Sequence, residues 1–97
     1  MSTKKLLEDI STNCLSQLTK YKFNKQLDVS DKYRAGKLAS LDYIQQLIYY
    51  FYERDRELKK EFQEIIEKQI IDAHKLKEGD YQTAVTETLK WVQEQSN

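Results

Sequence analysis

Cys14 and His74 form the one pair in the chain that joins a thiol to an imidazole base. Nucleophilic catalysis needs such a base within hydrogen-bond reach of the nucleophile. Cys14, however, falls on an apolar helical stripe, where a small buried side chain is the usual interpretation. Three glutamates recur on one predicted helix among lysines, as on a solvated face: Glu61, Glu64 and Glu67. We therefore predict no catalytic residues and a protein that is not an enzyme.

Patterns that bind metals, phosphates or cofactors are missing from the sequence. A helical di-metal site uses Glu-x-x-His, but the residue three positions before His74 is Ile71. A Cys/His zinc site needs several such residues, and the chain has one of each. Gly36 and Gly79 are too far apart to form a phosphate-binding loop. The sequence thus predicts no metal, no cofactor and no small-molecule substrate.

Composition favours one small helical domain over residues 1–97. The chain has no proline and two glycines, and this scarcity of turn-forming residues favours long helices. Its net charge is zero, but residues 1–40 carry eight Lys/Arg against four Asp/Glu. Residues 41–97 carry eight against twelve. The two halves have opposite charge and could attract each other within the chain or across a dimer.

Nothing in the sequence predicts export or membrane insertion. Residues 1–9 lack an apolar stretch long enough for a signal peptide. No segment approaches the roughly 20 apolar residues that a membrane-spanning helix needs. The single cysteine cannot form a disulfide within the chain. We expect a cytoplasmic protein that does not contact a membrane.

Apolar spacings of three and four predict an all-α fold. The first expected helix covers residues 2–23, and a connection follows over residues 24–30, where the periodicity lapses. Ser30 is a good cap for the next helix. The stripe of the first helix is formed by Leu7, Ile10, Cys14, Leu18 and Tyr21, widened by Leu6 and Leu15.

The middle of the chain reads as one helix, because no Gly, Pro or Asn occurs between Gly36 and Gly79. We predict a long central helix over about residues 38–78, roughly 60 Å long, with an N-terminal and a C-terminal helix packed on it. Its apolar stripe drifts one position after Ile65, to Ile66, Ile70 and Ala73. The alternative is a compact four-helix bundle with a break near Arg54-Asp55.

Residues 79–85, Gly-Asp-Tyr-Gln-Thr-Ala-Val, resemble the turn between the two helices of a tetratricopeptide repeat. In that family Gly-Asp/Asn-Tyr-x-x-Ala commonly opens the second helix. The motif occurs once in the chain, whereas a solenoid needs about three repeats. The chain also has Asp72 at the position where the family usually has a packing glycine. The resemblance therefore implies only a helical turn here, in which Gly79 ends one helix and Asp80 caps the next.

An aromatic run over residues 47–52, Leu-Ile-Tyr-Tyr-Phe-Tyr, covers every side of a helix. One core cannot bury all six side chains. Tyrosine suits interfaces, because it buries a ring and keeps a hydroxyl for water. We predict a non-enzymatic protein that contacts a second copy of itself, or another helical protein, through Tyr43, Tyr49, Tyr50 and Tyr52. In the alternative interpretation these tyrosines cover the edge of the protein's own core.

A second hypothesis rests on basic and aromatic residues over 20–37. Cations interleaved with Tyr21, Phe23 and Tyr33 are typical of single-stranded nucleic-acid surfaces. The zero net charge argues against this function, since nucleic-acid binders usually have a basic excess. The alternative function is that of a small nucleic-acid-associated regulator. Its candidate nucleic-acid contacts are Lys20, Lys22, Lys25, Lys32, Arg34 and Lys37.

Overall fold

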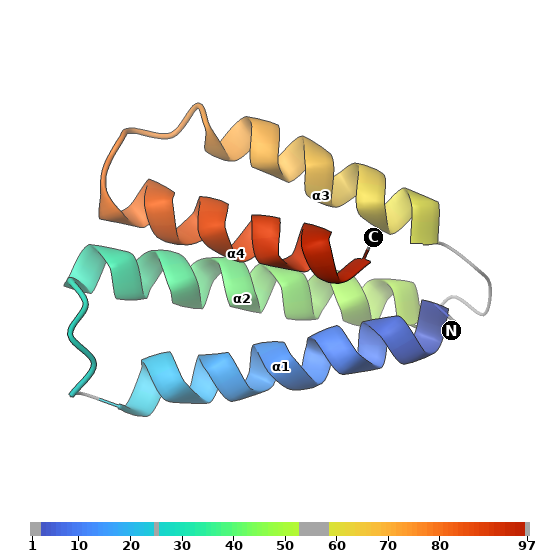
Figure 1. Cartoon of the computed structure of the whole chain (residues 1–97), viewed down its shortest axis with the longest axis horizontal. Coiled ribbons are helices and arrows are strands. Elements are labelled where there is room, and N and C mark those ends of the chain that lie inside the picture. The colour runs from blue at the N-terminus through green and yellow to red at the C-terminus, as the bar shows by residue number, and fades with distance from the viewer. Residues whose placement is uncertain (1–2, 25, 53–58, 97) are drawn as a thin grey trace.

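The chain folds into an all-α bundle, as its apolar spacing predicts (Figure 1). The structure is a computed structural model that describes residues 3–24, 26–52 and 59–96. In these residues it contains four helices: α1 (Thr3–Phe23), α2 (Asp31–Tyr52), α3 (Lys59–Ala73) and α4 (Asp80–Ser96). The first helix and the connection after it therefore lie where the sequence predicts them.

The predicted single helix over residues 38–78 is wrong. From Lys59 the chain runs back as α3, opposite in direction to α2 (Figure 1). The longest extent of the molecule is 39 Å, well short of the roughly 60 Å of a forty-residue helix. The alternative, a compact four-helix bundle, is the observed architecture. The predicted break at Arg54-Asp55 lies outside the described residues.

The two central helices of the bundle, α2 and α4, run parallel to each other (Figure 1). Helix α1 packs against α2 and α3 packs against α4, each antiparallel to its neighbour (Figure 1). In an up-down-up-down bundle the second and fourth helices usually face each other diagonally across the core. Here they are in direct contact, and the molecule is flattened to 39 × 29 × 19 Å.

Gly36 permits this contact. A Cβ atom added at Gly36 would lie 2.6 Å from the carbonyl oxygen of Tyr81 and 2.9 Å from the Cβ of Ala84. Two buried hydroxyls along the same helices are directed onto their own backbones. Ser40 donates to the Gly36 carbonyl at 2.7 Å, and Thr88 donates to the Ala84 carbonyl at 2.7 Å. Small residues with internally satisfied hydroxyls thus let the two helices approach closely.

The N-terminal ends of α2 and α4 are joined by a side-chain pair. Ser30 Oγ accepts a hydrogen bond from the backbone N–H of Tyr33 at 3.1 Å, which confirms its predicted role as a cap. The same hydroxyl donates to the carboxylate of Asp80. The cap carbonyl of α4 comes from Gly79, which accepts from Thr83 N–H at 3.0 Å. Asp80 is therefore the first residue of α4, not its cap, and its carboxylate bonds across to α2.

The turn that resembles a tetratricopeptide repeat separates α3 from α4, but Gly79 does not end α3, which already ends at Ala73. Gly79 has a φ of 150°, a conformation that favours glycine. Gln82 closes the turn, because its Nε2 donates to the carbonyls of Ala73, His74 and Leu76 at 3.0–3.2 Å. One amide therefore satisfies carbonyls that the end of α3 leaves without helical partners.

The core lies between α1, α2 and the α3–α4 pair. The drift of the stripe to Ile66, Ile70 and Ala73 is confirmed, since these side chains are buried. Leu15, expected at the edge of the α1 stripe, is instead 60% exposed. The buried apolar core consists of Leu7, Ile10, Cys14, Leu41, Ile44, Ile48, Phe51, Phe62, Ile66, Ile70, Ala73, Ala84, Leu89 and Val92.

Replacing Gly36 by Ala should lower the free energy of unfolding, although Ala is the better helix former by about 1 kcal/mol. The new methyl group would force α2 and α4 apart, and overpacking of this kind costs about 1–3 kcal/mol. Urea unfolding followed by circular dichroism measures the change. The control is Ala35→Gly on the exposed side of α2, which should lose about 1 kcal/mol from propensity alone. A Gly36→Ala protein more stable than the parent would contradict the close contact.

Phe62→Asp should unfold the domain. Phe62 is 1% exposed, and its ring meets that of Phe51 edge-on with centroids 5.8 Å apart. An unpaired carboxylate at this place costs several kcal/mol, a large part of a stability that is about 5–15 kcal/mol in typical domains. Glu64→Gln, on the exposed face of α3, is the control and should leave the circular dichroism spectrum and the melting temperature unchanged. Equal tolerance of both changes would mean that the faces of α3 are assigned wrongly.

Candidate protein-contact site

Three aromatic side chains remain on the surface at the end of α2. Tyr49 is 67% exposed, Tyr50 51% and Tyr52 41%. Tyr49 and Tyr52 are three positions apart and share one side of α2, and we call these two residues the tyrosine patch. Ile48 and Phe51, which alternate with them, are buried. Tyr50 lies on another side of the helix, where its ring packs edge-on against Phe51 with centroids 5.6 Å apart. The aromatic run thus divides between the core and the surface.

A groove between α1 and α2 continues the patch. Its volume is about 560 Å³. Both patch residues form part of its wall, and the other lining side chains are mainly polar. The lining residues are Glu8, Ser11, Thr12, Gln45, Ile48, Tyr49 and Tyr52. The patch and the groove together form one surface, which we call the α1–α2 face.

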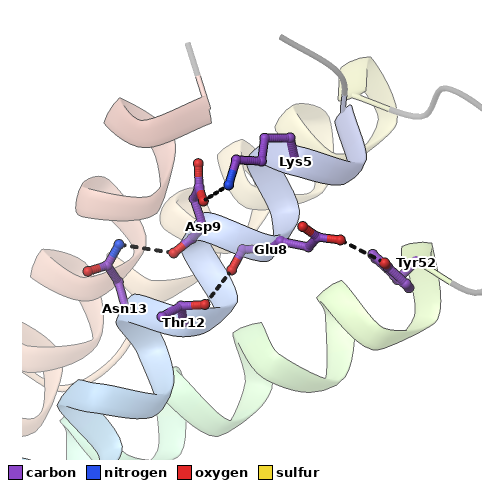
Figure 2. Close-up of polar contacts among 6 residues, drawn as sticks. All are labelled: Lys5, Glu8, Asp9, Thr12, Asn13 and Tyr52. Carbon is purple, nitrogen blue, oxygen red and sulfur yellow. Dashed lines mark hydrogen bonds and ion pairs between the residues drawn. The ribbon is translucent and has the colours of Figure 1, made fainter.

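Polar contacts hold the side chains of this face in place (Figure 2). The Tyr52 hydroxyl donates to Glu8 Oε1 at 2.8 Å, and Lys4 Nζ lies 5.5 Å from the centroid of the Tyr52 ring. The hydrogen bond to Glu8 raises the pKa of Tyr52, because it favours the protonated phenol. Two hydrogen bonds join Ser11 to Gln45. Ser11 Oγ donates to Gln45 Oε1 at 2.6 Å, and Gln45 Nε2 donates to the Ser11 carbonyl at 3.0 Å.

The α1 edge of the face is tied to its own helix. Lys5 pairs with Asp9 at 3.2 Å. Thr12, which lines the groove, donates to the Glu8 carbonyl at 2.9 Å, whereas Asp9 and Asn13 lie on the side of α1 away from Tyr52 (Figure 2). Side chains that are already ordered lose less conformational entropy when a partner binds. The α1–α2 face is therefore largely preorganised.

Tyr43, the fourth predicted contact residue, lies elsewhere. It is half-buried against the core, and burial raises the pKa of its hydroxyl. It lines a different cleft, together with residues of α3 and α4 such as Gln69 and Val85. The structure therefore places Tyr49 and Tyr52 together at the α1–α2 groove and separates Tyr43 from them.

The basic segment over residues 20–37 is only partly available at the surface. Lys20, Lys22 and Lys32 are exposed, and Lys25 lies outside the described residues. Arg34 donates to the backbone carbonyls of Tyr21 and Asn24. Two of the six candidates, Arg34 and Lys37, thus take part in internal packing.

Lys37 is the more deeply packed of the two, with 8% of its surface exposed. Its Nζ lies 5.8 Å from the ring centroids of both Tyr21 and Tyr33. Burial lowers the pKa of this amine, and the nearby Glu87 carboxylate opposes the effect. Glu87 also accepts a hydrogen bond from the Tyr33 hydroxyl at 2.6 Å. Internal contacts of Lys37 therefore compete with any contact to a phosphate.

The two residues that could support nucleophilic chemistry differ in environment. Cys14 has no exposed surface, and burial raises the pKa of its thiol to about 12. His74 is exposed in the turn after α3. Within residues 3–24, 26–52 and 59–96, no group of three or more His, Cys, Asp or Glu side chains could hold a metal ion. No helix in these ranges is long and apolar enough to cross a membrane.

Sequence reasoning missed the α1 side of the face. Glu8 reaches Tyr52 across 44 positions, and Ser11 reaches Gln45 across 34. No local pattern marks such pairs, because they depend on how α1 docks on α2. Only the exposed tyrosines left a signal in the sequence.

The fold and this face define a small all-α bundle with a preorganised aromatic surface. No protein-family model matches the chain, and no curated protein and no solved structure is significantly similar to it.

Cys14 should react much more slowly in the folded protein than in the denatured one. Only the thiolate attacks iodoacetamide, and at pH 8 a thiol with a pKa of about 12 is almost entirely protonated. We expect a rate at least roughly 100-fold lower than in denaturant, read by mass spectrometry. Because folding raises this pKa, the thiol should also reduce stability as the pH rises from about 9 towards 12. Equal labelling rates in both states would contradict its burial.

Proposed function

We propose that the protein acts without catalysis, through protein–protein contacts, as a cytoplasmic homodimer. The observation that carries the proposal is the tyrosine patch, in which Tyr49 and Tyr52 at the end of α2 are 67% and 41% exposed and line the α1–α2 groove. Soluble monomers rarely expose a contiguous aromatic patch unless it binds something. Tyrosine is also among the residues most enriched at protein interfaces.

A symmetric dimer suits the charges around the patch. Two-fold interfaces place the same surface of each copy against the other, so the surface must complement itself. The α1 edge of the α1–α2 face carries both signs, with Lys4 over the Tyr52 ring and Glu8 bonded to the Tyr52 hydroxyl. In a two-fold arrangement, cations of one copy can lie opposite carboxylates of the other. The face therefore combines an apolar centre with a charged rim that can pair with itself.

The second candidate function, a nucleic-acid-associated regulator, has weaker support. Its favourable observation is the exposed group at the end of α1, where Lys20 and Lys22 lie beside Phe23, which is 69% exposed. The internal contacts of Arg34 and Lys37 argue against it. Salt separates the two functions, because phosphate contacts weaken steeply with salt concentration and apolar contacts do not.

Replacing Tyr49 by Glu and Tyr52 by Gln in one chain should give a folded monomer. The glutamate places a charge in the apolar centre of the interface, and the glutamine can still donate to Glu8. Analytical ultracentrifugation should show the parent as a dimer and the double variant as a monomer, both with the same circular dichroism spectrum.

The matched control is Phe23→Glu, which removes an exposed aromatic ring at the opposite end of the bundle (Figure 1). It should leave the dimer intact. A parent that sediments as a monomer would overturn the homodimer. A double variant that unfolds would show that the two rings belong to the chain's own core.

A further inference from the structure

A second cleft lies on the other side of α2, between α2, α3 and α4, and encloses about 250 Å³. Its walls are largely apolar and include Ala39, Leu76, Val85 and Leu89. This volume lies just below the range of about 300–1,000 Å³ typical of ligand pockets. The cleft therefore fits a compact molecule with an apolar body.

The walls are fixed by contacts already described. Gln82 holds the carbonyls of the turn after α3, which positions Leu76 at the rim. The close approach of Gly36 to Tyr81 sets α4 against α2. Ser40 lies in the floor but directs its hydroxyl onto the carbonyls of its own helix. The cleft is thus preformed, and its floor offers no free hydroxyl proton.

Three polar side chains at the cleft have unused capacity to accept hydrogen bonds. Neither the Tyr43 hydroxyl nor the Gln69 amide has a hydrogen-bond partner in the described part of the chain, although both residues are half-buried. Asp72, the one charged residue of the lining, pairs loosely with Lys75 at 3.7 Å. That exposed pair is weak, so the carboxylate remains open to a better partner.

Gln69 and Asp72 share one face of α3, because they are three positions apart. Tyr43 adds a third oxygen from α2, and the Tyr81 ring adds an aromatic wall from α4. A primary ammonium has three N–H donors and no acceptor, and cations bind favourably at aromatic rings. An anion would meet the Asp72 carboxylate and no cation of the lining.

We propose that this cleft is a binding site for a compact primary amine. The apolar body lies against Ala39, Val85 and Leu89, and the ammonium donates to Asp72, Gln69 and the Tyr43 hydroxyl. This site is independent of the tyrosine patch, so the monomeric Tyr49→Glu, Tyr52→Gln variant should retain it.

Three probes of similar size test the proposal on the full chain at pH 7: phenethylamine, phenethyl alcohol and phenylacetate. They differ only in a cationic, neutral or anionic head group. In two-dimensional NMR of the ¹⁵N-labelled protein, phenethylamine should cause saturable shifts around Tyr43, Gln69 and Tyr81. It should bind about tenfold more tightly than phenylacetate. Shifts that do not saturate, or equal binding of the three probes, would overturn the proposal.

Two variants locate the head group and the body. Asp72→Asn should weaken the binding of phenethylamine about tenfold and leave the affinity for phenethyl alcohol unchanged. The control is Asp42→Asn, which removes an exposed carboxylate of α2 outside the cleft. This change should alter the affinity for neither probe. Ala39→Trp should fill the cleft and abolish binding of both probes. If Ala39→Trp instead converts a dimer into a monomer, a second copy covers the cleft and the amine site is wrong.

Discussion

The contact between α2 and α4 at Gly36 determines the arrangement of the whole bundle. Because a glycine faces a backbone carbonyl at this crossing, two helices that would normally be diagonal lie against each other. Their remaining faces must then be covered from opposite sides, by α1 on α2 and by α3 on α4 (Figure 1). The flattened shape and the two separate clefts beside α2 follow from this one close approach. Side chains alone would not explain it, since apolar residues pack equally well in a square bundle.

Much of the fold was predictable from local patterns. The ends of α1, the cap at Ser30 and the drift of the stripe after Ile65 all depend on residues a few positions apart, and the structure confirms them. The length of the central helix was not predictable in this way. Good helix formers continue through the 53–58 segment, so propensity gives no signal for a reversal. The reversal brings the Phe62 ring against Phe51, with centroids 5.8 Å apart, a contact that a straight helix does not allow between positions eleven residues apart.

The candidate sites were also predictable only where their residues lie close together in the sequence. Tyrosines at positions 49, 50 and 52 are recognisable in the sequence, because too many aromatic residues occupy one helix. The grouping of Gln69 with Tyr43 is not recognisable, because it combines two helices whose relative position depends on Gly36. Gly36 itself carried a signal in the sequence beyond its weak helix propensity. An isolated glycine inside a helical pattern also marks a close backbone approach, and here that second meaning applies.

The parallel pairing of α2 with α4 has a consequence for the order of folding. Helices α1 and α2 are neighbours in the chain and can form a hairpin early, since local contacts form fastest. The surface of α2 around Gly36, however, stays uncovered until residues 81–84 of α4, which begin 45 positions later in the chain, dock on it. Until then a nascent chain exposes part of the face of α2 that α4 later covers, and such exposed surface promotes misassembly. The crossing that permits the compact native state therefore also makes the docking of α4 on α2 the step that completes it.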